Sequence, residues 1–170
     1  MTSQFPDGTL PRMIEVAIHE IGYVEEPDNH TKYGKTMHAD GLAWCGSFLN
    51  WCAIIAKVKV PNTVSVIQGS QSFVKLGQLH IHDYAVGDFA YFNFAGKQQA
   101  QHVGLIVKLE PQYIYTIEGN TSGDKSQVNG GMVMLKKRDK KFVLWVGRPV
   151  YAAYEGSIPP LPAGIKLWKK

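Results

Sequence analysis

The sequence contains few cysteines: Cys45 and Cys52 are the two among its 170 residues. On one predicted helix they would point along the same face but lie roughly 10 Å apart, given a rise of about 1.5 Å per residue. This separation exceeds the reach of a disulfide bond. We therefore expect two free thiols, in a protein that is made and folded in a reducing cytosol.

The sequence also lacks long hydrophobic runs. No stretch approaches the roughly 18 apolar residues that a membrane-spanning helix needs, so membrane insertion is not expected. Residues 1–8 contain no basic segment followed by an apolar one and do not predict a secretory signal. The expectation is synthesis in the cytoplasm without a signal peptide, wherever the protein later acts.

Positive charges exceed negative charges only modestly, with 18 Lys and Arg against 14 Asp and Glu and a net charge of +4. The densest basic stretch is Lys-Lys-Arg-Asp-Lys-Lys at 136–141. Such a cluster is usually a solvated face, and a weak attraction to polyanions is the functional alternative. Because no aromatic-interleaved nucleic-acid signature accompanies it, no nucleic-acid partner is expected.

Hydrophobic residues make up 45% of the chain, which is enough for one compact domain with a substantial core. Helical spacing of apolar residues predicts helices early in the chain, and β-branched or aromatic runs with short connections predict an antiparallel sheet later. The expected helices cover 11–22, 44–57 and 70–77, and the expected strands cover 87–92, 102–108, 113–118, 131–136 and 142–151. Helices first and strands afterwards indicate an α+β domain.

The end of the chain differs from the rest in composition. Residues 155–164 read Glu-Gly-Ser-Ile-Pro-Pro-Leu-Pro-Ala-Gly. We interpret residues 1–154 as one domain and residues 155–170 as a Pro-rich, basic tail or linker with no core of its own. No internal repeat is apparent, and a monomer is expected.

The stretch from Asp40 to Ala53 carries the first candidate for chemistry. Its apolar residues fall at helical spacing from Trp44 onward, so Cys45 is expected where a loop becomes a helix. Unpaired backbone N–H groups and the helix dipole favour an anion there, and the thiolate is the nucleophilic form of cysteine. The alternative is that both cysteines are small core residues on one apolar face, which is the interpretation we favour for Cys52.

A cysteine nucleophile needs a base, and the base needs a group that orients it. His102 opens a predicted strand directly after a polar loop, and Glu118 and Asn120 end the next strand. The period of two would put Glu118 and Asn120 on one face, and antiparallel pairing would set that face beside His102. Taken alone, a histidine at a strand start is more often a surface residue. Turn chemistry would explain Gly119-Asn120 but not an inward-facing acid.

Four motifs follow one another along the chain: Trp-Cys-Gly-Ser-Phe at 44–48, Gly-Asp-Phe-Ala-Tyr-Phe at 87–92, His-Val-Gly-Leu-Ile at 102–106 and Ile-Glu-Gly-Asn-Thr at 117–121. In this order they resemble the CHAP family, the cysteine, histidine-dependent amidohydrolases/peptidases that are common in bacteriophage endolysins. The resemblance covers roughly residues 12–151. It implies a papain-like α+β fold, with N-terminal helices packed on a C-terminal antiparallel β-sheet, and cleavage of peptidoglycan stem peptides.

The resemblance also implies a role for individual residues. It places the nucleophile at Cys45, the general base at His102, the orienting acid at Glu118 and a polar fourth member at Asn120. Bacterial peptidoglycan is then the expected partner and the bacterial cell wall the place of action, by either an amidase or an endopeptidase. Two other interpretations stay open: a non-catalytic wall-binding or scaffold domain, and a cysteine amidohydrolase that acts on substrates other than the wall.

Neither a cofactor nor calcium is expected. Some CHAP enzymes bind calcium in a loop before the nucleophile and just after the cysteine. Here that loop offers only Asp28, Asn29 and Asp40, and Ser47 stands two residues after Cys45. A calcium ion takes about six to eight oxygen ligands and would be poorly served by this set.

A zinc site is not expected either. His80-Ile-His82 is the only close histidine pair, and the period of a strand would put both rings on one side. Because no third ligand follows at a fitting spacing, we interpret the pair as surface residues.

Overall fold

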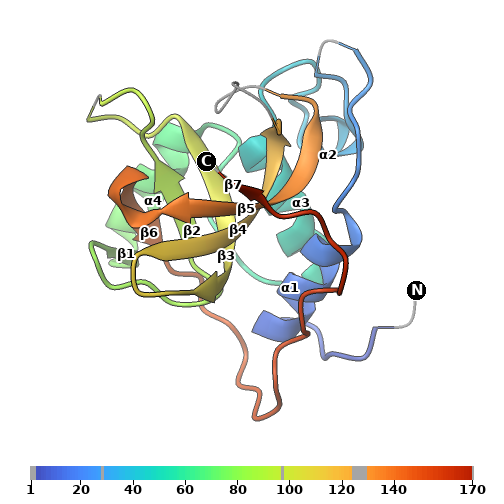
Figure 1. The fold of residues 1–170 in the computed structure, drawn as a ribbon, viewed down its shortest axis with the longest axis vertical. Coiled ribbons are helices and arrows are strands. Elements are labelled where there is room, and N and C mark those ends of the chain that lie inside the picture. Colours follow the sequence, from blue (N-terminus) through green and yellow to red (C-terminus); the bar gives the residue numbers. More distant parts are fainter. Residues whose placement is uncertain (1–2, 28, 97, 124–129, 170) are drawn as a thin grey trace.

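A computed structural model describes residues 3–27, 29–96, 98–123 and 130–169 of the chain. Within these residues four helices pack against a sheet (Figure 1). The helices are α1 (Leu10–His19), α2 (Lys32–Thr36), α3 (Cys45–Ala56) and α4 (Val66–Lys75). No helix in this described part of the chain has both the length and the hydropathy to cross a bilayer. The predicted α+β class, with helices first and strands afterwards, is confirmed.

The described strands form one sheet in the order β1-β6-β2-β3-β4-β5-β7. Their bounds are β1 (Leu79–His80), β2 (Phe89–Phe92), β3 (His102–Leu109), β4 (Tyr113–Thr121), β5 (Met132–Asp139), β6 (Val143–Gly147) and β7 (Trp168–Lys169). Neighbouring strands are antiparallel except β7, which runs parallel to β5. Strands β3 and β4 therefore lie side by side inside the sheet, with further strands on both sides.

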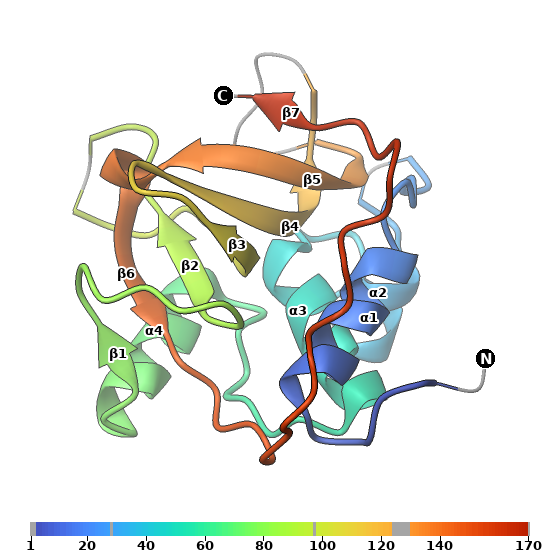
Figure 2. The same cartoon turned by 60° about the horizontal axis from the view of Figure 1, so that its bottom comes forward.

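Helices α1, α2 and α3 gather on one side of the sheet, and α4 lies next to β1 and β6 (Figure 2). Side chains alternate along each strand, so the sheet buries residues on both faces. Val103 and Ile117 belong to the larger cluster, which includes residues of the helices, whereas Ile106 and Ile114 belong to a second, smaller cluster. The sheet thus has an apolar layer on each face, and α3 contacts β3 and β4 directly.

Helix α3 agrees with the predicted range of 44–57 apart from its two capping residues. Trp44 is the N-cap, with φ −117° and ψ 16°, and its side chain makes no capping hydrogen bond. Lys57 ends the helix in the left-handed conformation, with φ 54°. Phe48 and Leu49 are fully buried, as expected for a helix that is enclosed by its neighbours.

The first turn of α3 is held against the segment that follows the helix. Asn50 accepts hydrogen bonds from the backbone N–H and the hydroxyl of Thr63, both at 2.7 Å. Its amide also donates to the carbonyl of Pro61 at 3.0 Å. A Cβ on Gly46 would collide with the carbonyl of Thr63, so the glycine after Cys45 is required by this close approach.

Asp88, in the Gly-Asp pair before β2, holds neighbouring segments together. The Asp88 carboxylate is almost fully buried and accepts a hydrogen bond from the N–H of Ala85 at 2.8 Å. Arg148 donates to both of its oxygens, from Nε and Nη2, each at 2.9 Å. These contacts tie the start of β2 to the residue that follows β6.

Two helices differ from their predicted ranges. Helix α1 ends at His19, before its predicted end at Gly22. Gly22 lies beyond the helix with φ 96° and donates its N–H to the carbonyl of Val133. Helix α4 begins earlier than predicted because the Ser65 hydroxyl accepts a hydrogen bond from the N–H of Gln68 and caps it. Tertiary contacts and a cap, rather than apolar spacing, set these ends.

The C-terminal segment lies along the domain, as the red part of the chain in Figures 1 and 2 shows. Ala152 bridges to Thr9, and β7 adds to the edge of the sheet beside β5. The residues of this segment that pack against the larger core cluster are Leu161, Ile165 and Leu167. The sequence did not predict β7, because a strand of two residues is defined by its partner and not by its own composition.

Candidate active site

The four residues predicted for the site come from three elements. Cys45 begins α3, His102 begins β3, and Glu118 and Asn120 lie near the end of β4. All four are buried, with exposed fractions of 3% for Cys45 and 0% for the other three. The fold therefore brings residues that are up to 75 positions apart in the sequence into its buried interior.

Cys45 is the first residue of α3, where the prediction placed it. The first helical hydrogen bond runs from the N–H of Phe48 to the carbonyl of Trp44, so the three preceding N–H groups have no partner within the helix. Trp44 adds no side-chain cap. Both this feature and the helix dipole favour negative charge on the Cys45 sulfur or on an oxygen bound beside it.

Cys52, two turns further along α3, lies in the core as predicted. Its exposed fraction is 0%, and both cysteines are free thiols. Burial raises the pKa of the Cys52 thiol well above its ordinary value, and the charge of Glu20 adds to the effect. Cys52 therefore stays protonated and unreactive.

The His102 ring is bound on one side only. Its Nε2 lies 2.9 Å from Oε2 of Glu118. Its Nδ1 is buried and has no hydrogen bond of ordinary geometry to any described residue. The ring lies near those of Phe92 and Phe94, with centroids 6.1 and 6.2 Å away. The adjacent-strand geometry predicted for His102 and Glu118 is thus present.

Glu118 is held by two other side chains. Arg138 donates from Nε to Oε1 at 2.9 Å and from Nη2 to Oε2 at 2.6 Å, and the Thr116 hydroxyl donates to Oε1 at 2.6 Å. Burial raises the pKa of Glu118, but the charge and hydrogen bonds of Arg138, with those of His102, outweigh it and hold the pKa far below its ordinary value. Glu118 is therefore a carboxylate, and Nε2 of His102 is the donor in the bond between them.

The charge state of His102 depends on both of its neighbours. Burial lowers the pKa of the ring, but Cys45 and then Glu118 outweigh this and raise the pKa to about 9. Among the effects that raise the pKa of the ring, that of Cys45 is the largest. Because Glu118 occupies Nε2, Nδ1 is the nitrogen that can exchange a proton with the thiol. The site can therefore hold an imidazolium beside a thiolate.

Two glycines of the predicted motifs make room for this arrangement. A Cβ at Gly104 would lie 2.6 Å from Cγ of Glu118, so the bare backbone of β3 lets the Glu118 side chain pass toward His102. A Cβ at Gly119 would lie 2.7 Å from Cβ of Phe48, so the end of β4 lies against the first turn of α3. Both motifs carry glycine where two parts of the site meet.

Asn120 lies where the strand period, which predicted it on the face of Glu118, is interrupted. Its φ is 51°, and the pairing of β4 with β5 shifts register between Glu118 and Thr121. Such a bulge breaks the period of two. The Oδ1 of Asn120 accepts a hydrogen bond from the N–H of Gly130 at 3.2 Å, whereas its buried Nδ2 has no partner among the described residues. Asn120 thus offers a donor that the described protein does not use.

Arg138 and Thr116 are the residues of the site that the sequence reasoning missed. The expectation of a solvated face at 136–141 is wrong for Lys136 and Arg138, whose exposed fractions are 1% and 0%. Lys136 donates to the carbonyl of Ser122 at 2.7 Å, and Arg138 binds the carboxylate of β4. The alternation along β5 is the signal that could have identified both residues, because it puts them on one face.

Asp40, one of the residues considered for calcium, has other partners, whereas the buried side-chain oxygens of Asn29 and Ser47 have none among the described residues. Asp40 accepts the N–H of Thr31 at 2.9 Å with Oδ1, and its Oδ2 lies 3.0 Å from Nδ1 of His30. Asp28 lies outside the described residues. Among the residues that are described, no group of three His, Cys, Asp or Glu side chains could hold a metal ion.

The histidine pair considered for zinc is not arranged as predicted. Strand β1 ends at His80, and His82 has φ 60°, so the strand period does not extend over both rings. His80 lies 3.4 Å from Asp83, whereas His82 lies 3.3 Å from the hydroxyl of Tyr84. The two rings thus have different neighbours.

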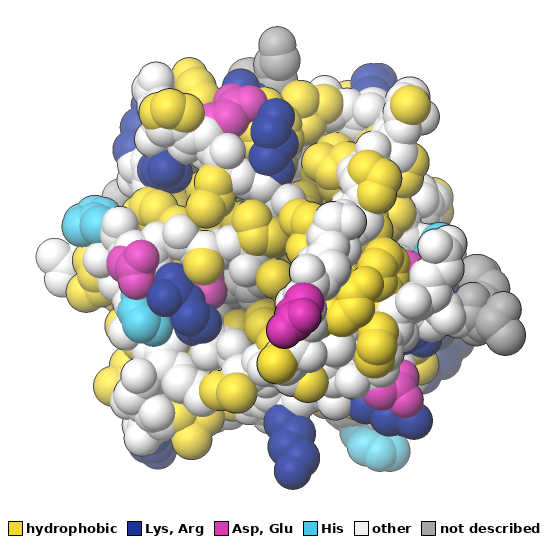
Figure 3. Space-filling model, turned by 90° about the horizontal axis from the view of Figure 1, so that it is seen from below, with side chains coloured by type: hydrophobic (Ala, Val, Ile, Leu, Met, Phe, Trp, Pro, Cys, Tyr) yellow, Lys and Arg dark blue, Asp and Glu magenta, His cyan; other side chains and the backbone are white. Residues whose placement is uncertain are grey.

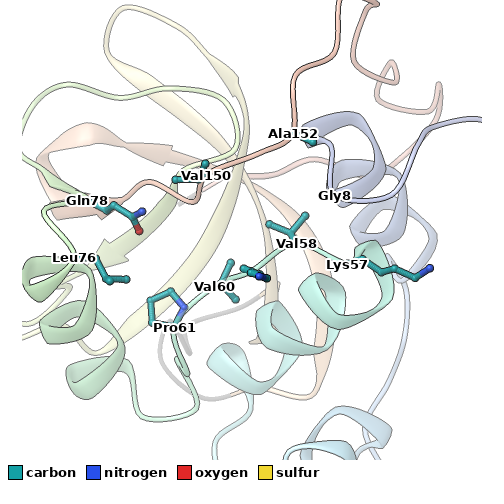
Figure 4. A pocket seen from close by; sticks show the side chains of 10 residues that line it. Gly8, Lys57, Val58, Val60, Pro61, Leu76, Gln78, Val150 and Ala152 are labelled. Carbon is teal, nitrogen blue, oxygen red and sulfur yellow. The ribbon is translucent and has the colours of Figure 1, made fainter.

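Several cavities border the described part of the domain. One, of about 540 Å³, lies near the end of α3 that is remote from Cys45 (Figure 4). Hydrophobic side chains also gather near the middle of the face seen in Figure 3. A second cavity, of about 490 Å³, includes Ala100, two residues before His102. The first is lined by Gly8, Lys57, Val58, Lys59, Val60, Pro61, Leu76, Gln78, Val150 and Ala152, and the second by Ile67, Ser70, Gln71, Gln98, Gln99, Ala100 and Trp145.

No known protein family, curated protein sequence or solved structure matches this chain. The chemistry of the site follows from its own residues. It consists of a thiol at a helix start, an imidazole with one nitrogen bound to a carboxylate, and an arginine that keeps that carboxylate ionised. These groups can generate a thiolate nucleophile and move a proton to and from Nδ1 of His102.

Proposed function

We propose that this protein is a cysteine hydrolase that cleaves an amide bond in the stem peptide of peptidoglycan, as the CHAP family that its motifs resemble does. One observation carries the chemistry: Nε2 of His102 is bound to Glu118, while its buried Nδ1 has no hydrogen bond to a described residue. Cys45 is the largest of the influences that raise the pKa of this ring. The wall substrate is supported by the order of the four motifs within residues 44–121.

The reaction begins with the Cys45 thiolate and the His102 imidazolium. The sulfur attacks the carbonyl carbon of the amide, a C–S bond forms, and the carbonyl electrons move to the oxygen. The unpaired N–H groups of the first turn of α3 stabilise this oxyanion. Asn120 is the candidate for a second donor, because its Nδ2 is buried without a partner among the described residues.

The second half of the reaction uses the same ring. The C–N bond breaks as Nδ1 of His102 gives its proton to the leaving amine. The neutral ring keeps its other proton on Nε2, toward Glu118, so Nδ1 can accept a proton from the water that attacks the thioester. Glu118 remains a carboxylate throughout and stabilises the imidazolium, as the buried acid does in serine triads. The water oxygen bonds to the carbonyl carbon, the C–S bond breaks, and the free acid leaves while Cys45 returns as the thiolate beside the imidazolium.

The test is the clearing of a turbid suspension of purified bacterial wall material, with casein hydrolysis measured in parallel. The wild-type protein should clear the suspension, and Cys45→Ala should not. Hydrolysis of casein without clearing would redirect the proposal to a cysteine amidohydrolase with other substrates. Binding to the wall without soluble products would favour the non-catalytic binding domain. Mass spectrometry of the released fragments then separates an amidase from an endopeptidase.

A further inference from the structure

Arg138 is a buried cation on β5. Its exposed fraction is 0%, and its guanidinium carbon lies 4.8 Å from the ring centre of Phe94 and 5.7 Å from that of Phe92. An arginine keeps its charge in a protein, and a buried charge is strongly destabilising unless it is paired. Two donors of Arg138 are bonded to the Glu118 carboxylate, the group that also binds His102.

We propose that Arg138 is a positioning residue of the active site, which fixes the ring proton of His102 on Nε2 by holding Glu118 as an oriented carboxylate. This rests on the proposed Cys–His hydrolase. Arg138 and Thr116 both donate to Oε1 of Glu118 and occupy it. Oε2 receives the other Arg138 donor and has one position left, which Nε2 of His102 takes.

Loss of the guanidinium would reverse the bond between Glu118 and His102. A fully buried carboxyl group without a cation favours its protonated form. Protonated Glu118 has an O–H to donate, so Nε2 would become the acceptor and the neutral ring would carry its proton on Nδ1. A ring protonated on Nδ1 cannot take a proton there from the thiol or from water. In serine triads, the corresponding loss of the acid lowers kcat by about 10⁴-fold through the wrong tautomer.

The charges of the site lead to the same conclusion. With Arg138 in place, the guanidinium and the imidazolium balance the carboxylate and the thiolate. Without Arg138, the same enclosed space holds one excess negative charge when the thiolate forms. Because like charges in a poorly solvated site repel strongly, the thiolate would become less favourable.

The experiment uses the full chain with Arg138→Met and Arg138→Lys, and Arg148→Lys as the matched control. Arg148 binds both oxygens of Asp88 in the same way, at 2.9 Å each. Within the described part of the chain Asp88 makes no hydrogen bond to His102, and it precedes β2 at the end opposite to Phe92, the residue that pairs with His102. The first readout is ¹⁵N NMR of the histidine rings without substrate, above the pH at which His102 becomes neutral. The second is the rate at which a small alkylating reagent labels Cys45.

We expect the proton on Nε2 of His102 in the wild type and in Arg148→Lys, and on Nδ1 in Arg138→Met. Labelling of Cys45 in Arg138→Met should slow by at least about 10-fold, as for other partners that orient a reactive side chain. A folded Arg138→Met with the wild-type tautomer and labelling rate overturns the proposal. If Arg138→Met does not fold, Arg138→Lys decides. Lysine keeps the positive charge but cannot donate to both oxygens of Glu118 as Arg138 does. An unchanged rate of Cys45 labelling in Arg138→Lys therefore overturns the proposal, and a slower rate supports it.

The failure of this proposal can be told apart from the failure of the proposed function. The ring tautomer and the labelling rate are both measured without wall material. If the wild type does not clear the wall suspension but Arg138→Met still moves the proton of His102, then the hydrolase assignment falls and the role of Arg138 in setting the ring stands.

Discussion

The side chain of Glu118 passes over Gly104 on its way to His102, so closely that a Cβ at residue 104 would lie 2.6 Å from Cγ of Glu118. The carboxylate cannot simply move aside, because Arg138 and Thr116 bind its oxygens. Gly104 has no left-handed φ, so an alanine there could adopt the backbone conformation. The missing Cβ, rather than backbone freedom, is what the site uses.

Gly104→Ala should therefore impair the site more than the fold. We expect kcat on wall material to fall about 10- to 100-fold, because the hydrogen bond between Glu118 and His102 is displaced. The free energy of unfolding should fall by about 1–3 kcal/mol through overpacking. Gly131→Ala is the control, since its nearest neighbour, Cγ of Glu25, would lie at an ordinary 3.4 Å. Denaturant titration and turbidity assays measure the two effects, and an unimpaired Gly104→Ala would contradict the assignment of Glu118.

The two cysteines should respond oppositely to alanine substitution. Cys45→Ala removes a sulfur at a helix start, so the fold should persist while hydrolysis disappears. Cys52→Ala leaves a small cavity in the core and should cost about 1–2 kcal/mol of stability while activity is retained. Thermal unfolding and wall clearing are measured on both variants. Activity above a few per cent in Cys45→Ala, or an inactive but fully stable Cys52→Ala, would reverse the assignment.

Chelation should have no effect. The loop before α3 contains Asp40, whose two carboxylate oxygens are already engaged by Thr31 and His30. Prolonged treatment with a strong chelator should therefore leave both turnover and the melting temperature unchanged. A loss of activity that calcium alone restores would show that this loop holds a required ion, and Asp28, Asn29 and Asp40 would be the first ligands to substitute.

The contacts of the central strands could be anticipated from the sequence because they depend on local patterns. Apolar spacing located α3, and the strand period together with antiparallel neighbours put Glu118 beside His102. The close approaches at Gly46, Gly104 and Gly119 give physical reasons for the glycines within the motifs.

Other parts of the structure depend on tertiary contacts and could not be predicted from local sequence patterns. A bulge interrupts the strand period at Asn120, and the local residue types do not predict a bulge there. Arg138 lies in a basic stretch whose composition favours solvent, and its ion pair with Glu118 makes burial acceptable. Strand β7 likewise exists through its pairing with β5.

The titration of His102 tests the distance between the ring and the thiol. In the wild type, Cys45 and Glu118 overcome burial and raise the pKa of His102 to about 9. Cys45→Ala removes the largest raising effect and leaves burial, which lowers the pKa, so the midpoint should move down from about 9. NMR titration of the His102 ring measures it, with Cys52→Ala as a control that should leave the midpoint unchanged. An unchanged midpoint in Cys45→Ala would place the sulfur out of reach of the ring.

Selective alkylation separates an enzyme from a binding domain without knowledge of the substrate. An isolated thiol has a pKa near 8.5, so at about pH 6 it is less than about 1% thiolate. If His102 stabilises the thiolate, a small alkylating reagent at this pH should label Cys45 and spare Cys52, which is buried and protonated. His102→Ala removes the cation and should slow the labelling sharply, although the sulfur becomes no less exposed, whereas substitution of the exposed His82 should not. Equal labelling of the two cysteines, or a rate at Cys45 that is indifferent to His102 in a folded variant, would mean that the two residues do not act as a pair. The non-catalytic binding domain would then be the better explanation of this buried site.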